Sequence, residues 1–153
     1  MGKFKADQKG FTLIELLTVI SIIGILSALG LTSFSVYRSS AAYGVANKTL
    51  RDGVTALEAS LNNVDDPPGA VGLTTQSSQG PIQDPRAAEL LPGMMVPRLT
   101  KFAVSYDPTC EDSSCEMSSM QVNHCQGEEY IRYVRFGDGL GVWLEHLAGD
   151  GCA

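Results

Sequence analysis

The sequence predicts an α+β fold, in which one long N-terminal helix is joined to a small antiparallel β-sheet. Three observations support this prediction: an almost uncharged apolar run at residues 11–31, an amphipathic helical pattern that continues to about residue 62, and strand-like segments after Pro97. The length of 153 residues suits one globular domain with an appendage. We expect a short basic segment at residues 1–10, the helix at 11–62, a connecting loop region at 63–98 and a sheet-bearing head at 99–153.

The apolar run at residues 11–31 has the length of a membrane span. Glu15 is its only charged residue. Because an α-helix rises about 1.5 Å per residue, a helical run of this length extends about 30 Å, which is the thickness of a bilayer core. We therefore expect this segment to enter a membrane at some stage.

The helical pattern then continues without a break. Apolar residues such as Phe34, Leu50 and Leu57 recur mostly at intervals of three or four, and charged residues fill most of the other positions. No proline precedes Pro67, and the stretch Asp66-Pro67-Pro68-Gly69 ends the helix. A helix of about 75 Å is too long for the remaining mass to cover. We therefore expect the hydrophobic half to protrude and the amphipathic half to pack on the sheet.

The second half of the chain changes from loop-like to strand-like composition. Residues 63–98 are rich in Pro, Gly, Ser, Thr and Gln, with a short helical turn expected at 86–91. The pair Asp138-Gly139 between two β-rich segments predicts a hairpin. The expected strands are residues 99–106, 117–123, 129–136 and 140–147.

Composition and motifs argue against several classes of function. The net charge is −6, and three of the lysines lie within the first ten residues, so the rest of the chain is more acidic still. Such a surface disfavours nucleic acid as a partner, because phosphate binding needs clustered Lys and Arg. The glycines at 137, 139 and 141 have no helix behind them, as a phosphate loop requires. We find no catalytic motif, and we expect neither an enzyme nor a cofactor.

Four cysteines, Cys110, Cys115, Cys125 and Cys152, lie in the last third of the chain. An even number after an export-type segment favours disulfides formed in an oxidising compartment. Three pairings are open; we favour Cys110–Cys115 and Cys125–Cys152. A zinc site with His124 is the alternative, although the spacing lacks the paired C-x2-C of structural zinc sites. A calcium site in the acidic loop around Cys110 and Cys115 is a further alternative, without EF-hand spacing.

Two ordinary explanations of the N-terminal region leave Glu15 unexplained. A secretory signal with cleavage after Gly30 would have a shorter apolar core. A plain transmembrane anchor fits the length, but an acidic residue deep in a span costs about 2.5–3.5 kcal/mol. Glu15 lies near one end, where the cost is smaller, and such a residue usually has a partner.

The stretch from Lys9 to Leu26, KG-FTLIELLTVISIIGIL, resembles the N-terminal signature of type IV pilins and type II secretion pseudopilins. The resemblance is close over residues 9–31 and implies a pilin-like fold. It implies that a membrane prepilin peptidase cuts after Gly10 and methylates the new N-terminal residue, Phe11. Glu15 matches the acidic residue at the fifth position of the mature family members.

A physical argument agrees with what the resemblance implies. Cleavage creates a positive amine on Phe11, and the Glu15 carboxylate of one subunit can pair with the amine of a neighbour inside an apolar filament core. Because neither charge is favourable there alone, the pair would set the register of assembly. Many members of the family carry a proline in this helix where the present chain has Leu31-Thr32, which makes a minor pilin or pseudopilin more plausible.

We therefore expect a structural subunit of a type IV pilus-like filament. Its expected partners are further copies of the chain, the prepilin peptidase, the inner-membrane assembly machinery and, before assembly, membrane lipid. The precursor would lie in the inner membrane, and the processed chain in an extracellular pilus. The alternatives are a pseudopilin or minor pilin of a secretion or pilus-like machine, in the periplasm, and a membrane-anchored, disulfide-bonded binding module.

Overall fold

The computed structural model describes residues 10–63, 68–127 and 129–148. Its internal contacts divide the chain into two compact units, of which the first ends at Tyr37 and the second begins at Arg38.

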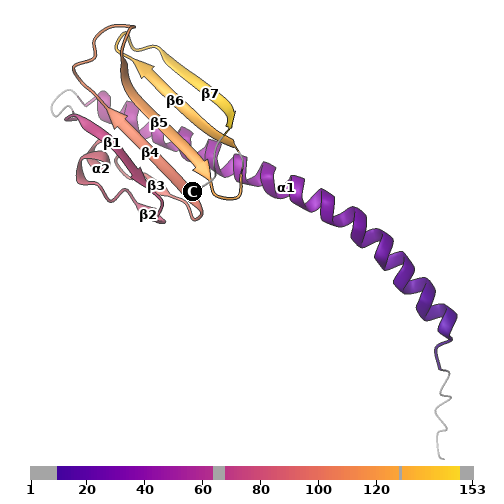
Figure 1. Cartoon of the computed structure of the whole chain (residues 1–153). Helices are drawn as coiled ribbons and strands as arrows, with labels where there is room; N and C mark the ends of the chain where they lie inside the picture. The colour runs from indigo at the N-terminus through magenta and orange to yellow at the C-terminus, as the bar shows by residue number, and fades with distance from the viewer. Residues whose placement is uncertain (1–9, 64–67, 128, 149–153) are drawn as a thin grey trace, which may run out of the picture. The chain divides into compact units, whose positions relative to one another are not determined.

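Helix α1 (Leu13–Leu61) has 49 residues and confirms the predicted long N-terminal helix (Figure 1). The backbone is helical across Leu31 and Thr32, as it is across Gly24 and Gly30. Two isolated glycines cost only about 1 kcal/mol each relative to alanine, so the strong helix formers around them maintain the helix.

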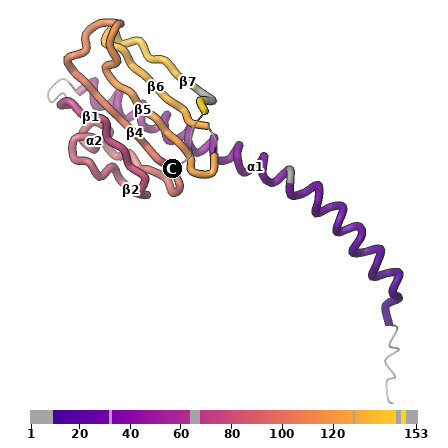
Figure 2. The backbone as a smooth tube through the Cα atoms, in the orientation of Figure 1, coloured from indigo at the N-terminus to yellow at the C-terminus, as the bar shows by residue number. Residues whose placement is uncertain are grey.

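A five-stranded antiparallel sheet forms the body of the second unit, with strand order β1-β4-β5-β6-β7. Figure 2 shows β4 to β7 following one another side by side, as a meander. The predicted β6–β7 hairpin is confirmed: the Phe136 N–H donates to the Leu140 carbonyl, and Gly139 adopts a positive φ of 86°. The strands are β1 (Val71–Gln76), β4 (Thr100–Tyr106), β5 (Glu116–His124), β6 (Glu129–Phe136) and β7 (Gly141–Ala148).

The region expected as a connecting loop, residues 63–98, contains more structure than the sequence predicted. Besides β1 it holds the short strands β2 (Gly80–Pro81) and β3 (Met95–Val96), which pair with each other, and helix α2 (Pro85–Leu90). Asp84 caps α2, because its carboxylate accepts the Ala87 N–H at 2.9 Å. The short helix agrees with the expected turn at 86–91, whereas β1 forms through pairing with β4, far along the chain.

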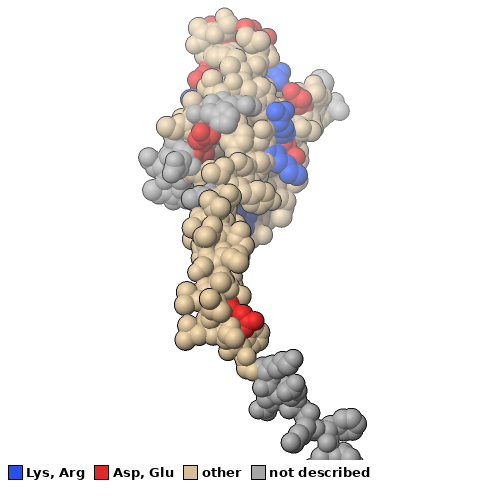
Figure 3. Space-filling model, turned by 90° about the vertical axis from the view of Figure 1, so that its right-hand side faces the viewer, with Lys and Arg blue, Asp and Glu red and all other residues tan. Residues whose placement is uncertain are grey.

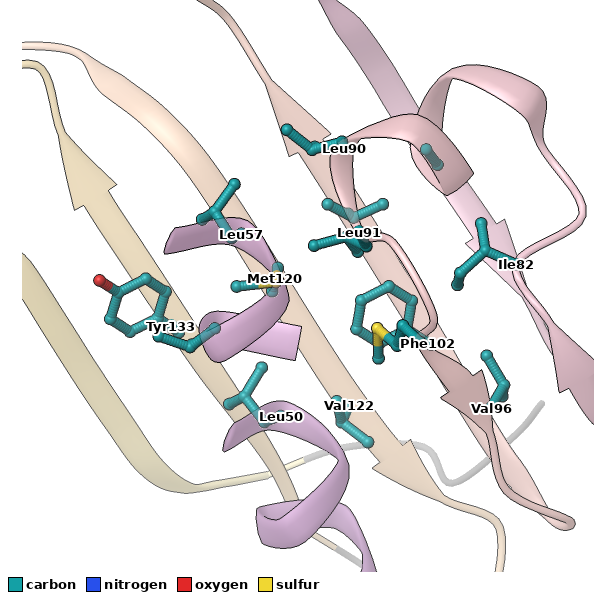
Figure 4. Close-up of a cluster of buried hydrophobic side chains, with 14 of the residues drawn as sticks. Leu50, Leu57, Ile82, Leu90, Leu91, Val96, Phe102, Met120, Val122 and Tyr133 are labelled. Carbon is teal, nitrogen blue, oxygen red and sulfur yellow. The ribbon is translucent and has the colours of Figure 1, made fainter. Parts of the chain in front are cut away.

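The core lies between the sheet and the part of α1 that belongs to the second unit. Strand β4 alternates buried and half-buried side chains along its whole length, which places one face against the helix. Figure 4 shows side chains from α1, from the strands and from the α2 region meeting in one cluster. Its fully buried members include Leu50, Leu57, Leu90, Phe102, Met120 and Val122. At Gly53 the helix packs closely against Met94 and Met120, and an added Cβ would lie 3.3 Å from the sulfur of each.

Candidate functional site

The bond between Gly10 and Phe11 lies outside the helix, in an exposed stretch. Gly10, Phe11 and Thr12 are not helical, and Phe11 is 87% exposed. A Cβ added to Gly10 would meet no atom within 4 Å, and the residue does not have a positive φ. The fold therefore gives no steric reason for glycine at this position.

Glu15 and Thr12 form a capping box at the start of α1. The Thr12 N–H and hydroxyl donate to the same Glu15 carboxylate oxygen, Oε2, at 2.9 and 2.8 Å. In return, the Glu15 N–H donates to Thr12 Oγ1 at 3.3 Å, and the Thr12 carbonyl accepts the first helical hydrogen bond, from Leu16. Thr12 was not among the residues predicted from the sequence, although a Thr-x-x-Glu pattern before an apolar run is a known signal for this motif.

The apolar segment exposes its side chains in this single copy. Every residue from Phe11 to Tyr37 whose side chain is described is exposed. The segment is long and apolar enough to cross a membrane, judged by length and composition alone. Its large apolar members include Leu13, Ile14, Leu17, Ile20, Ile23, Leu26 and Leu29. Figure 3 shows this part of the chain as an almost continuous surface without charge. An exposed apolar surface of this size needs a lipid or protein partner.

Three hydroxyl groups within this segment bond to its own backbone. Thr18 Oγ1 donates to the Glu15 carbonyl at 2.9 Å, and Ser21 Oγ donates to the Leu17 carbonyl at 2.8 Å. Ser33 makes the same kind of bond to the Leu29 carbonyl at 3.3 Å. Because these donors are already satisfied, they add little to the cost of placing the helix in an apolar environment.

The second unit holds the cysteines. The predicted disulfide Cys110–Cys115 is present and closes a short loop after β4. Cys125 is also disulfide-bonded. Its predicted partner, Cys152, lies outside the described residues, so that pairing stays a prediction.

The disulfide loop rests on the β6–β7 turn. The Gly137 N–H donates to the Asp112 carbonyl at 3.0 Å, and a Cβ at Gly137 would lie 2.6 Å from the Glu111 carbonyl carbon. Asp107 and Asp112 each accept hydrogen bonds within their own turns, from Thr109 and Ser114, and these bonds lower the pKa of both carboxyl groups. Within the described part of the chain, no cluster of three or more His, Cys, Asp and Glu residues could hold a metal ion.

His124 lies at the end of β5, near the point where the second unit begins. It is 8% exposed, and its Nδ1 accepts the Gln126 N–H at 3.2 Å. Arg38 donates to the Gln126 side-chain carbonyl at 2.9 Å. Burial, and then the nearby positive charge of Arg38, lower the pKa of His124. The described contacts give this residue a packing role in the turn between β5 and β6.

The N-terminal region of the chain is similar in sequence to known proteins. Residues 5–31 match the prokaryotic N-terminal methylation motif. The chain is 48% identical over 54 residues to a type IV major alpha-pilin of Moraxella bovis, covering 35% of this chain and 34% of that protein. It is 37% identical over 84 residues to the fimbrial protein EcpB of Eikenella corrodens, covering 55% and 50%. It is 52% identical over 52 residues to a type IV major fimbrial protein FimA of Dichelobacter nodosus, covering 33% and 31%. The matches thus span a third to a half of these relatives.

Proposed function

Because this chain belongs to the type IV pilin family through its N-terminal methylation motif, we propose that it is the precursor of a structural subunit of a type IV pilus-like filament. In this proposal residues 1–10 are a leader peptide, which a prepilin peptidase removes by cutting after Gly10. The same enzyme methylates the new amine on Phe11. The apolar segment holds the precursor in the inner membrane and later forms the filament core, with the acidic head outside.

One observation carries the proposal: Gly10 is exposed, non-helical and not required by the fold, and it lies directly before Phe11 within the methylation motif. Recognition by a processing enzyme gives a reason for glycine at this position, because it is the residue directly before Phe11 within the motif. The exposed apolar surface from Phe11 to Tyr37 supports the proposed places of this segment in the membrane and in the filament core, because lipid and a bundle of identical helices both cover such a surface.

Glu15 supplies the specificity of assembly in this proposal. An unpaired carboxylate in an apolar core costs several kcal/mol, and a neighbour's amine offsets that cost only when the two copies dock in register. Copies that dock out of register leave the charge unpaired and dissociate.

The test is intact-mass spectrometry of the chain from native membranes and from sheared surface material. We expect loss of residues 1–10 and the gain of one methyl group, in both fractions. Replacing Gly10 with leucine should leave the uncut precursor in the membrane, and because the fold has room for that side chain, misfolding would not explain the block. Gly24→Ala, which also has open space around it, is the matched control and should be cut normally.

The outcomes separate the proposed function from its alternatives. An uncut chain, or cleavage after Gly30, would refute the pilin role and favour an anchored or secreted binding module. Correct processing with no sheared filaments would instead favour a pseudopilin or minor pilin. The unbroken helix across Leu31 and Thr32, where many family members have proline, is the observation that favours a pseudopilin or minor pilin.

A further inference from the structure

The turn between β3 and β4 holds an exposed leucine in an unfavourable backbone conformation. Leu99 has a φ of 59°, and among the described residues it is the only one other than glycine with a positive φ. A branched side chain rarely adopts this left-handed region, which glycine and asparagine enter more easily. Leu99 is also 41% exposed, so burial in the core does not account for a leucine here. A strained and exposed apolar residue points to a contact with something outside the chain.

Contacts within the second unit connect this turn to the place where that unit begins. The Leu99 carbonyl accepts the Cys125 N–H at 2.8 Å. The next residue, Gln126, accepts a hydrogen bond from Arg38 Nε at 2.9 Å. Arg38 is the first residue of the second unit, and it directly follows the exposed apolar segment that ends at Tyr37. The turn at Leu99 therefore lies at the end of the second unit where the chain enters it.

The length of the apolar segment places Arg38 at the surface of a bilayer. The helical stretch from Leu13 to Tyr37 extends roughly 37 Å, and a bilayer with its headgroups is about 40–45 Å thick. Arg38 is the first charged residue after Glu15. Phe34 and Tyr37 are exposed, and aromatic side chains favour the boundary between acyl chains and headgroups. When the segment spans a membrane, Arg38 lies at headgroup level whatever angle the two units make, because it is bonded directly to Tyr37.

The exposed side chains at this end suit a phospholipid surface. Arg98 precedes Leu99 in the turn, and Arg38 and Arg98 are both exposed. A guanidinium group donates paired hydrogen bonds to phosphate, and a leucine beside it can enter the boundary between headgroups and acyl chains. Glu128 and Glu129 follow closely after Gln126 in the sequence, so net charge does not draw this end to an anionic membrane. The attraction must come from the hydrogen bonds to phosphate and from burial of the leucine.

We propose that Arg38, Arg98 and Leu99 form a surface that binds phospholipid headgroups and holds this end of the second unit against the membrane before assembly. The two arginines bind phosphate groups, and Leu99 inserts between them and the acyl chains. The proposal rests on the function proposed above, because it requires the apolar segment to span the membrane. Entry into a filament must then release this contact.

The first test measures whether position 99 reaches lipid. The full-length chain is placed in vesicles of phosphatidylethanolamine and phosphatidylglycerol, with lipids brominated near the headgroup end of the acyl chain, because bromine quenches tryptophan fluorescence on contact. With Trp143→Phe as background, tryptophan is introduced by Leu99→Trp or, as the control, by Leu140→Trp. Leu140 is 60% exposed and follows the β6–β7 turn, at the other end of β6 from the β5–β6 turn. We expect brominated lipid to reduce the fluorescence of the Leu99→Trp variant and to leave that of the Leu140→Trp variant unchanged.

The second test concerns the arginine beside the leucine. Arg98→Gln, added to the Leu99→Trp variant, removes the guanidinium group, so the loss of fluorescence with brominated lipid should become smaller. Arg86→Gln is the matched control, because Arg86 is an exposed arginine on α2, and it should leave the loss of fluorescence unchanged. An equal loss with and without Arg98 would overturn the proposal.

A third measurement separates membrane contact from packing within the fold. Leu99→Asn removes the apolar side chain, and asparagine tolerates the left-handed conformation better than leucine does. If Leu99 serves the membrane, the urea midpoint of the full-length chain in detergent micelles, followed by Trp143 fluorescence, should stay the same or rise. A lower midpoint would show that the leucine stabilises the fold, and the proposal would fall.

Flotation of the vesicles in a density gradient shows which hypothesis has failed. If the chain does not float with the vesicles, the apolar segment does not hold it in a membrane, and the proposed function fails together with this inference. If the chain floats but the Leu99→Trp variant is quenched no more than the Leu140→Trp variant, only the lipid-binding surface is refuted.

Discussion

Replacement of Gly137 by alanine should destabilise the head through one identifiable clash. The added Cβ would lie 2.6 Å from the Glu111 carbonyl carbon and 2.7 Å from the Asp112 carbonyl oxygen, well inside normal contact distance. Overpacking of this kind costs about 1–3 kcal/mol. If Gly137 and the backbone of residues 111–112 moved apart, the 3.0 Å hydrogen bond from the Gly137 N–H to the Asp112 carbonyl would also weaken. Loss of that bond adds about 1 kcal/mol to the destabilisation. We therefore expect the free energy of unfolding to fall by about 2–4 kcal/mol.

Urea unfolding of the full-length chain in detergent micelles measures this loss. Trp143 is the only tryptophan, and its ring lies 4.9 Å from that of Tyr133, so its fluorescence reports on the head. With a urea dependence of about 2 kcal/mol per molar, the midpoint should fall by about 1–2 M. Gly72→Ala is the matched control, because a Cβ there meets nothing within 4 Å, and it should change stability by no more than about 0.5 kcal/mol.

The disulfide provides a further test of whether the clash causes the loss of stability in Gly137→Ala. The Cys110–Cys115 bond restricts how far residues 111 and 112 can move away from an added methyl group. In a variant with both cysteines replaced by alanine, the penalty of Gly137→Ala should shrink. Identical midpoints for Gly137→Ala and Gly72→Ala would refute the reasoning.

Two further predictions concern pH and the core. Because the pKa of His124 is lower in the folded chain than its unfolded value of about 6.5, the unfolded state binds more protons below that pH. The free energy of unfolding should therefore fall as pH drops from about 6.5 towards the folded pKa. His124→Gln should reduce the change in urea midpoint between about pH 7.5 and 5.5. An equal change of midpoint with pH in wild type and variant would contradict this. Leu57→Ala, at a fully buried position on α1, should cost about 2–5 kcal/mol in the same assay. Leu73→Ala, where the leucine is 75% exposed, should cost less than about 0.5 kcal/mol, and equal losses would place the core elsewhere.

The elements that the sequence predicted well depend on local rules. Helix α1 follows from an apolar and then amphipathic pattern with no proline before Pro67, and the β6–β7 hairpin follows from Asp138-Gly139. Strand β1 was missed because the Pro, Gly, Ser and Gln residues around VGLTTQ favoured a loop. Its valine and threonines suit a strand, which forms by pairing with β4. The loops around it are fixed by contacts such as those of Gln76, whose side chain bonds to the backbone of Ser78, Pro81 and Gln83.

The residues of the candidate site also fall into those found from the sequence and those found only from the structure. The proposed roles of Gly10, Phe11 and Glu15 come from the order of these residues along the chain, because a peptidase site and a charge pair are both recognised by residue type and spacing. The role of Thr12 became visible only from the atoms, since a pattern cannot show that both of its donors meet one oxygen of Glu15.

The sequence alone determined where the chain is apolar, where its helix begins and ends, and which residues match the N-terminal methylation motif, since these depend on neighbours within a few positions. Only the tertiary structure decided that the 110–115 loop lies on Gly137 and that residues 71–76 complete the sheet. Both are contacts between segments distant in sequence. They form because packing and hydrogen bonding in the folded chain outweigh the weak local preferences of the residues involved.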